Sequence, residues 1–438
     1  MAGGTWTTQN KVRPGVYNNV ETSGGALGTV GSRGITSLAL TLPWGAAKVI
    51  TPIIAGEDTF KTLGYDITAP ELLLVREALK RARTVLLYKL NDGTKSTVTV
   101  GTLVATARYG GIRGNALKVV VQTNIDDSSK FDVKTLLDNA VVDTQVVANI
   151  AGLIPNDWII WSGTGTLTAN AGAPLIGGAN GTVTNADHTA YLSALELYDF
   201  QTVALTSTDN ALKAVYAAFV RRLRESEGKK VQAALENYPV ADFEGVISVK
   251  NGVVLSDGTI LTAAQATAWV AGASAAAEMN ESLTYSAYDD AVDVAPRYTN
   301  TQIEAALKAG EFVFTPSVNR AVVEQDINTF LSYTPKKGKQ LQKNRVLRVL
   351  DGIANDLKRI FESFYIGKVS NNVDGRALFR KEAVIYLDNL QGIDAIQNFD
   401  AQTDITVLPG VDSDAIYVEA NIQPVDSIEK VYMKVQVR

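Results

Sequence analysis

Apolar residues recur at helical spacing in seven stretches of the chain, and each stretch predicts an amphipathic helix. In the strongest pattern, Leu212, Tyr216, Phe219 and Leu223 fall on one face. Pro70 and Glu71 suit the start of another helix, since proline is tolerated in the first turn and a carboxylate complements the helix dipole. The predicted helices are one that begins near Pro70 and residues 187–198, 210–227, 262–278, 299–309, 339–365 and 374–387.

Shorter runs of alternating or continuous apolar residues predict strands, because side chains in a strand point to opposite faces in turn. Between residues 94 and 180 these runs dominate and helical periodicity is weak. Between residues 187 and 334 strands and helices alternate, which indicates an open α/β sheet. The predicted strands are residues 35–40, 47–50, 84–90, 97–106, 117–122, 141–147, 158–161, 164–168, 201–205, 245–249, 312–314, 320–323, 415–420 and 430–437.

Together these patterns predict a mixed α/β core with an inserted β-rich domain and extended arms at both ends. The N-terminal residues are polar and glycine-rich, so they are not expected to fold by themselves. The length of 438 residues suggests about three domains. The predicted divisions are an N-terminal arm (1–25), the first part of the core (26–92), the β-rich insert (93–180), the α/β domain (181–334) and a C-terminal domain (335–438).

The last predicted strand alternates strictly up to the end of the chain. Val431, Met433, Val435 and Val437 share one face, and Tyr432 lies on the other. Such a strand can pair within its own domain or add to the sheet edge of a neighbouring subunit. The N-terminal arm, with Val12, Val16, Tyr17 and Val20, is equally suited to become an added strand.

Composition removes several kinds of chemistry. The chain has no cysteine and only one histidine, His188, so disulfides, thiolate metal sites and sites that need two imidazoles are excluded. The net charge of −5 does not indicate nucleic-acid binding. No apolar run is long enough for a membrane-spanning helix, and the N-terminus lacks the features of a signal peptide. Residues 335–381 nevertheless carry a net charge of +8, which suggests a solvated helix face or a docking surface for an acidic partner.

The sequence lacks the Walker A motif for nucleotide binding and the EF-hand motif for calcium binding. A Walker A loop needs glycine five positions before each Gly-Lys pair, but Leu223, Tyr333 and Glu362 stand there. The cluster of Asp289, Asp290 and Asp293 lacks the EF-hand pattern and is expected to be a solvated loop. We expect His188 on the surface or near a helix cap rather than as a catalytic base. Asp157 with Trp158 and Trp161 could bind a sugar, although core aromatics are commoner on strands.

Several segments resemble contractile phage tail sheath proteins of the kind found in Gram-positive myophages, defective prophages and phage-tail-like bacteriocins. The most specific are the C-terminal run from Tyr417 to Met433 and the helix start Lys343-Asn344-Arg345-Val346-Leu347-Arg348-Val349-Leu350-Asp351. Pro14-Gly15-Val16-Tyr17, Pro43-Trp44-Gly45 and Arg113-Gly114-Asn115 match the same pattern. The resemblance spans nearly the whole chain.

The resemblance implies a structural subunit and not an enzyme, with no cofactor or metal. Sheath subunits form hexameric rings stacked around a tail tube, and they contract by rotation to drive the tube through a cell envelope. The implied partners are other copies of the chain, the tail tube protein, the baseplate and the tail terminator, with no nucleic acid and no membrane insertion. The implied location is a virion tail or bacteriocin particle that is assembled in the bacterial host cytoplasm.

The resemblance also assigns roles to residues. The exchanged strands would be formed by Val12, Val16, Tyr17 and Val20 at one end and by Val431, Tyr432, Met433, Val435 and Val437 at the other. The basic block would face the tube, with Lys336, Lys337, Lys339 and Lys343 as candidates. The alternative function is a capsid or baseplate protein whose β-rich domain binds a surface.

Overall fold

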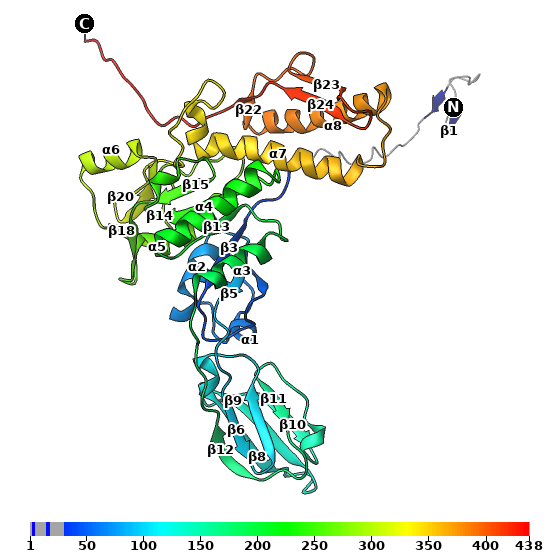
Figure 1. The fold of residues 1–438 in the computed structure, drawn as a ribbon, viewed down its shortest axis with the longest axis vertical. Helices are drawn as coiled ribbons and strands as arrows, with labels where there is room; N and C mark the ends of the chain where they lie inside the picture. Colours follow the sequence, from blue (N-terminus) through cyan, green and yellow to red (C-terminus); the bar gives the residue numbers. More distant parts are fainter. Residues whose placement is uncertain (1, 5–14, 18–29, 438) are drawn as a thin grey trace. The chain divides into compact units, whose positions relative to one another are not determined.

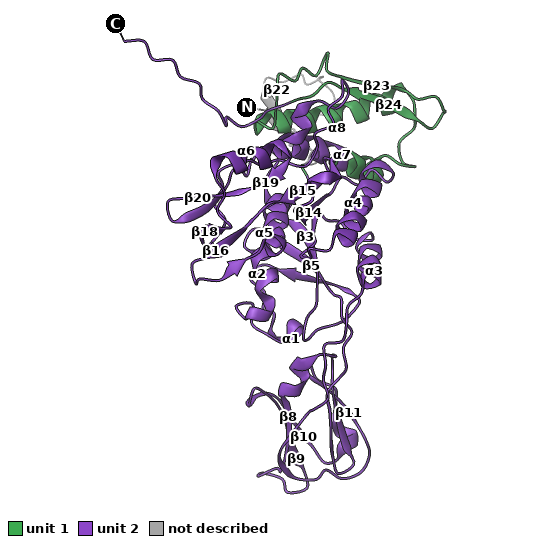
Figure 2. Cartoon of the chain, turned by 60° about the vertical axis from the view of Figure 1, so that its left-hand side comes forward, with its two compact units in different colours: residues 1–30, 356–423 green, residues 31–355, 424–438 purple. Residues whose placement is uncertain are grey.

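A computed structural model describes residues 2–4, 15–17 and 30–437 of the chain (Figure 1). The chain divides into two compact units (Figure 2). The larger unit comprises residues 31–355 and 424–438, and the smaller comprises residues 1–30 and 356–423.

The larger unit is built on a seven-stranded sheet in the order β19-β15-β14-β13-β3-β5-β4. Neighbouring strands are parallel except for β4, which runs antiparallel to β5 at one edge. Pro52 lies in this edge strand, where a missing N–H donor is tolerated. The strands are β3 (Ile35–Leu40), β4 (Ile50–Ile54), β5 (Thr84–Lys89), β13 (Thr202–Ala204), β14 (Gln232–Glu236), β15 (Val246–Val249) and β19 (Glu311–Phe312).

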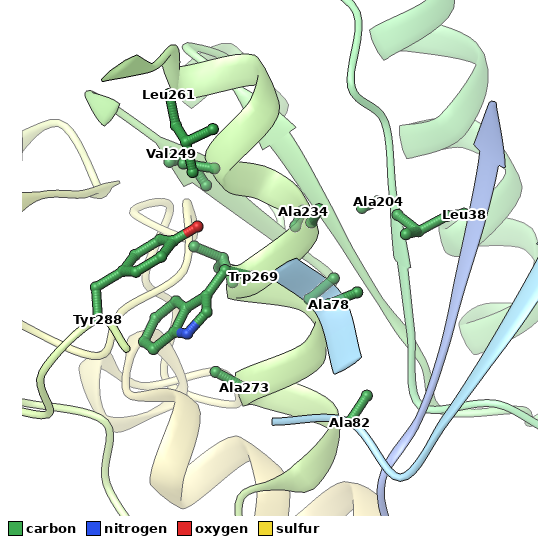
Figure 3. Close-up of a cluster of buried hydrophobic side chains, with 14 of the residues drawn as sticks. Leu38, Ala78, Ala82, Ala204, Ala234, Val249, Leu261, Trp269, Ala273 and Tyr288 are labelled. Carbon is green, nitrogen blue, oxygen red and sulfur yellow. The ribbon is translucent and has the colours of Figure 1, made fainter. Parts of the chain in front are cut away.

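Helices cover both faces of this sheet, so its strands are apolar on both sides. Leu38 packs in one core with Ala78 and Trp269, which come from α2 (Leu73–Leu79) and α5 (Ala263–Ala276) (Figure 3). Its neighbour Ala39 packs in the opposite core with residues of α3 (Asn185–Leu195) and α4 (Asn210–Glu225). This alternation is what the two-residue period of a strand requires.

The β-rich insert is a sandwich of two sheets, ordered β10-β9-β8-β12 and β11-β7-β6. Both sheets contribute to one apolar cluster that contains Leu103, Val119 and Trp158. Its strands are β6 (Thr97–Val100), β7 (Leu103–Ala107), β8 (Leu117–Thr123), β9 (Phe131–Leu137), β10 (Ala140–Val147), β11 (Ile159–Ser162) and β12 (Asn170–Pro174).

Three small features complete the larger unit. One is a three-stranded sheet in the order β17-β16-β18, and another is the hairpin β20–β21. The third is a group of short helical segments, among them the 3-10 turn Lys339–Gln342. The elements are β16 (Gly252–Leu255), β17 (Ile260–Leu261), β18 (Ala291–Ala295), β20 (Phe314–Ser317), β21 (Arg320–Val323), α1 (Phe60–Leu63) and α6 (Asn300–Lys308).

The long helix α7 (Asn344–Phe364) begins in the larger unit and ends in the smaller one. In the smaller unit α8 (Val373–Gly392) packs on a two-stranded antiparallel sheet of β23 (Ile405–Pro409) and β24 (Ile416–Ala420). The other strands near the ends of the chain are β1 (Ala2–Gly4), β2 (Gly15–Tyr17), β22 (Ile396–Gln397) and β25 (Gln423–Pro424).

The predicted mixed α/β fold with a β-rich insert is confirmed, whereas several predicted elements differ from the structure. The run at 97–106 is a hairpin of β6 and β7 and not one strand. The strand expected at 47–50 starts at Ile50 instead, because Lys48 has a left-handed backbone with φ of 61°. No strand forms at 164–168, where Gly163 and Gly165 have positive φ. The helix expected from residue 339 begins at Asn344, since Lys343 is extended after the 3-10 turn.

Candidate assembly site

The C-terminal segment forms no regular structure within its own chain. Residues 425–437 contain no helix or strand, so the strand expected at 430–437 is absent from the subunit (Figure 1). Its apolar side chains are three-quarters or more exposed, namely Val431, Tyr432, Met433, Val435 and Val437. An extended segment without a sheet partner leaves its backbone N–H and C=O groups unpaired by protein, and this explains why the alternating pattern alone does not produce a strand.

Just before this exposed run, Glu429 is held in place by three side chains. Lys343 forms an ion pair with the Glu429 carboxylate. Thr284 Oγ1 donates to Oε1 and Gln325 Nε2 donates to Oε2, each at 2.9 Å. We call Glu429, Lys343, Thr284 and Gln325 the root clamp, because they fix the point from which the C-terminal segment leaves the larger unit.

The root clamp keeps Glu429 ionised. Burial raises the pKa of Glu429. The hydrogen bonds from Lys343, Thr284 and Gln325 and the positive charge of Lys343 together outweigh burial, so the net shift is downward from the ordinary value of 4.5. The Glu429 side chain is only 10% exposed, which limits screening of its ion pair by solvent.

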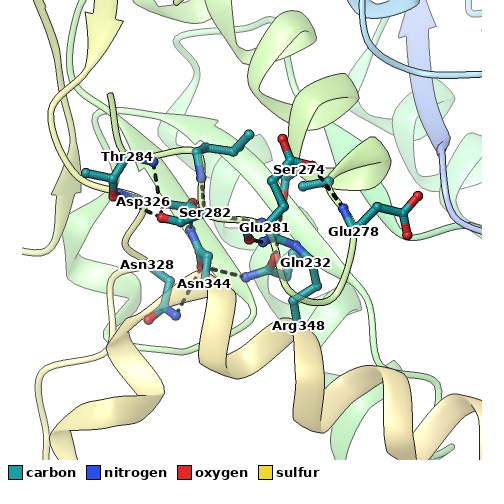
Figure 4. A network of polar contacts seen from close by, with 12 residues as sticks. Gln232, Ser274, Glu278, Glu281, Ser282, Thr284, Asp326, Asn328, Asn344 and Arg348 are labelled. Atoms are coloured by element: carbon teal, nitrogen blue, oxygen red, sulfur yellow. Dashed lines mark hydrogen bonds and ion pairs between the residues drawn. The ribbon is translucent and has the colours of Figure 1, made fainter. Parts of the chain in front are cut away.

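The root clamp rests on a buried polar network (Figure 4). Asp326 accepts from Asn344 Nδ2 at 2.8 Å and from Arg348 Nη2 at 3.3 Å, so it ties its loop to the first turns of α7. Its own backbone N–H donates to Thr284 Oγ1 at 3.0 Å. Arg348 also donates to the Glu281 carbonyl at 2.6 Å. These linked hydrogen bonds connect the loops that carry Thr284 and Asp326 to the start of α7, next to Lys343, and so favour one arrangement of the root clamp.

A groove of about 1230 Å³ lies beside the root clamp in the larger unit. Its lining includes Ser427, Ile428 and Lys430 together with residues of α6 and of the segment before α7. Its lining mixes acidic residues such as Glu304 with basic residues such as Lys308. The groove therefore has no single charge that would select a charged ligand.

The smaller unit contains a sheet with unused edges. Among residues 30–437, β23 pairs only with β24, and β24 only with β23. Arg380 of α8 supports this sheet by donating to the Ile405 carbonyl at 3.1 Å. Tyr417 and Leu408 are about half exposed. The outer edges of β23 and β24 thus carry backbone groups that no other described strand pairs with.

The N-terminal candidates are only partly described. Val16 and Tyr17 lie in β2, which pairs in parallel with β1. Val12 and Val20 lie outside the described residues. Their part in strand exchange stays a prediction.

The four candidate tube-facing lysines differ in their surroundings. Lys337 pairs with Glu244 at 2.8 Å, and Lys343 belongs to the root clamp. Lys336 and Lys339 are exposed. Lys337 and Lys343 are thus already neutralised by carboxylates, and a role in facing a tube stays a prediction for all four.

His188 is buried and not on the surface, but it directly follows the capping residue Asp187 in the first turn of α3, so the alternative of a histidine near a helix cap is confirmed. Its Nδ1 lies 2.9 Å from the Tyr216 hydroxyl, and burial lowers its pKa. The neighbouring Asp187 caps α3 instead, since it accepts from the Thr184 backbone N–H and pairs with Lys48. His188 therefore has a structural partner in the core beneath α3.

The other candidate chemistry also has structural explanations. Asp289 accepts from Arg81 Nε at 2.6 Å and from Trp269 Nε1 at 2.9 Å, and Asp293 pairs with Arg297 at 2.7 Å. Trp158 is buried and packs against Trp44, with ring centroids 5.5 Å apart, as expected for a core aromatic.

The described residues contain no group of three or more side chains arranged to hold a metal ion. No helix in the described part of the chain combines the length and the apolar character needed to cross a bilayer.

The motif Arg113-Gly114-Asn115 and the buried residue Lys89 lie where the β-sandwich joins the core. Arg113 donates to the Gly64 carbonyl at 2.9 Å and lies over the ring of Tyr65. Asn115 exchanges hydrogen bonds with the Gly178 backbone. Lys89 donates to the Gly110 carbonyl at 2.5 Å, and burial lowers its pKa to about 8. The contacts of Arg113 and Lys89 link the insert to the core, whereas those of Asn115 join two parts of the insert.

The sequence predicted the alternating apolar run at the C-terminus, but it did not predict the contacts of the root clamp. Lys343 and Glu429 are 86 positions apart, so no local pattern pairs them. The available signal was that each lies in one of the two most specific resembling segments. Thr284, Gln325 and Asp326 carried no signal, because they lie in loops.

Models of the phage tail sheath family match most of the chain. They are the tail sheath protein Gp18 domain III N-terminal region (33–90), the sheath beta-sandwich domain (91–180), the sheath central domain (181–329) and the sheath C-terminal domain (336–438). The chain therefore belongs to the phage tail sheath family, whose members are structural proteins of phage tails and phage-like particles.

Individual relatives agree with this assignment. A sheath tail protein from Desulfitobacterium hafniense has a solved structure that is 61% identical, covers 97% of this chain and 100% of its own, and has a TM-score of 0.87. The phage-like element PBSX protein XkdK of Bacillus subtilis (strain 168) is 38% identical over the whole of both chains. The helical sheath of the anti-feeding prophage in its contracted state shares the fold, with 14% identity, coverage of 97% and 99%, and a TM-score of 0.56.

Proposed function

We propose that this sheath subunit polymerises by strand exchange into stacked hexameric rings around a tail tube. The observation that carries the proposal is the C-terminal run 431–437, which alternates apolar and polar residues, is exposed, and follows directly on a fixed root. Such a run has the form of a strand that lacks only a sheet edge.

The proposed acceptor is the β23–β24 sheet of a neighbouring subunit. Each strand of this sheet has an edge that pairs with no other described strand, so an added strand would satisfy backbone groups of the acceptor as well as of the arm. A seven-residue strand would form about four to seven backbone hydrogen bonds, each worth about 1 kcal/mol net. Its four apolar side chains would each add about 1.5–3 kcal/mol if fully buried.

Contraction would follow from movement of rigid subunits and not from covalent chemistry. In this proposal the exchanged arms keep neighbours tethered while the larger units rotate between two packings. The extended array stores free energy because it is kinetically trapped above the contracted one. The tube would then be driven through a cell envelope, and the particle would be a phage tail or bacteriocin assembled in the host cytoplasm. The tube protein, the baseplate and the tail terminator would be its partners.

A truncation tests strand exchange. A chain that ends at Lys430 keeps the whole root clamp but lacks the exposed run, and we expect it to fold normally and to form no tubes. A matched full-length control carries Val411→Ser, because Val411 is fully exposed and lies in a loop of the smaller unit outside the arm. Negative-stain microscopy and sedimentation report the outcome. Normal tubes from the truncated chain would overturn the proposal, and isolated rings from the full-length chain would favour a capsid or baseplate role instead.

The basic block provides a separate test of tube contact. Lys336→Glu with Lys339→Glu reverses two charges without touching an ion pair described above, so it should weaken co-assembly with the tube by about tenfold or more at low salt. Lys337 and Lys343 are left intact because their replacement would break the contacts with Glu244 and Glu429. Tube-free sheath assembly serves as the control. Unchanged co-sedimentation with the tube would remove these lysines from the interface.

A further inference from the structure

The C-terminal segment passes from a residue with side-chain partners, Glu429, to exposed residues within two positions. Glu429 is bound by three side chains that rest on a buried network, whereas Val431 and every residue after it that the structure describes are exposed. Glu429 is therefore the last residue of the segment that the body of the subunit holds by side-chain hydrogen bonds, and it lies just before the alternating run.

The position of this point has a geometric consequence. Along an extended chain alternate side chains share a face, so Glu429 falls on the same face as Val431, Met433, Val435 and Val437. A root that is fixed at Glu429 therefore fixes which face of the following strand is apolar. A shift of one residue in such a strand turns all of its side chains to the opposite face.

We propose that Glu429 is a positioning residue that sets the register and facing of the exchanged C-terminal strand. The inference rests on the proposed strand exchange and adds the residue that defines where the strand begins. Without a fixed root, the arm would slide along the acceptor and could pair in several registers. With it, subunits join in one geometry, as a helical polymer requires.

Insertions between Lys430 and Val431 test the register directly. One inserted alanine moves the apolar side chains to the wrong face, so the critical concentration for tube formation should rise by about tenfold or more. Two inserted alanines restore the facing, and the rise should be less than about threefold. Equal effects of the two insertions would overturn the inference. An arm that is not fixed at Glu429 could shift along the acceptor and compensate for either insertion.

A charge swap tests whether the root clamp does the positioning. Lys343→Glu and Glu429→Lys singly remove the ion pair. Because the chain has no cysteine, a single nitroxide label can be attached through Ile428→Cys, an exposed position, and its mobility in the unassembled subunit should rise in both variants. The double swap should recover the restricted label mobility and tube formation at least in part. Hydrogen exchange at residues 326–348 shows whether each variant is folded. Higher label mobility in the single variants without any change in assembly would contradict a positioning role.

These outcomes separate the two proposals. If the chain that ends at Lys430 still forms tubes, strand exchange itself is wrong. If that chain fails to assemble but the one-residue insertion assembles normally, strand exchange stands and only the positioning role of Glu429 is lost.

Discussion

At the residue scale, the charged residues of the two resembling segments act within the subunit. Lys343 binds Glu429, Arg348 binds Asp326, and Asp351 binds Arg224. Each interaction links residues that are far apart in the sequence and buries most of the charge. These three charged residues therefore specify how distant segments of the chain meet.

The pair formed by Arg224 and Asp351 should be essential for stability. Both guanidinium Nη atoms contact the carboxylate, at 2.6 and 2.8 Å, and Arg224 is 4% exposed. Arg224→Met leaves Asp351 without its partner, and we expect a loss of about 3–5 kcal/mol in the free energy of unfolding. The double variant Arg224→Met/Asp351→Leu removes both charges and should recover at least half of this loss. Denaturant unfolding of the natural chain, Arg224→Met and the double variant measures these free energies. A double variant that is no more stable than Arg224→Met alone would contradict the account.

His188 should make the subunit less stable in acid. Burial lowers its pKa in the folded chain, so as the pH falls below about 6.5 the unfolded state takes up a proton that the folded state does not. Stability due to this group is therefore present above the unfolded pKa and is lost as the pH falls toward the folded pKa. Thermal unfolding between pH 7.5 and 5 should show a smaller decline for His188→Gln than for the natural chain. Parallel pH profiles would refute this assignment.

At the element scale, close packing of α2 against α5 depends on one glycine. A Cβ on Gly272 would lie 2.4 Å from the Ala78 carbonyl oxygen, which is a backbone atom and cannot rotate away. Gly→Ala inside a helix usually stabilises by about 0.5–1 kcal/mol, but here we expect a destabilisation of about 1–3 kcal/mol. The control is Gly392→Ala in α8, where nothing lies within 4 Å. Chemical denaturation compares them, and a stabilised Gly272→Ala protein would show that α2 is free to move.

Local patterns predicted the long helices but not every element of the central sheet. The helix at 210–225 was predictable from its apolar stripe. The strand β14 was not, because Gln-Ala-Ala-Leu-Glu has no β-branched or aromatic residue, and only its place between β13 and β15 makes it a strand. The start of α7 was misplaced for a similar reason, since Lys343 pairs with Ile327 of a distant segment and is held extended.

The candidate assembly site also has one part that local sequence patterns predicted and one part that they did not. The alternating run at 431–437 is a local pattern, and the sequence predicted that it would be available for exchange. The root clamp depends on contacts across about 86 to 145 positions, so it became visible only in the folded chain. The absence of a strand at 430–437 also depends on context, since a strand exists only when an edge is present to pair with.

At the scale of the whole molecule, the chain is a tail sheath subunit whose three apolar clusters lie in the larger unit. Its two covered sheet faces and its β-sandwich are rigid cores, whereas its C-terminal run has no partner among the described residues. The proposed mechanism needs only rigid bodies, tethers and two packings. The lack of cysteine and the single buried histidine are compatible with such a role.

The most direct test of strand exchange is a helical reconstruction of the assembled sheath at a resolution that traces the backbone. The account predicts continuous density from Glu429 through residue 437 that adds a strand to the β23–β24 sheet of a different subunit, with Glu429 still bound to Lys343 of its own. Residues 431–437 paired with their own subunit, or unpaired in the polymer, would contradict it.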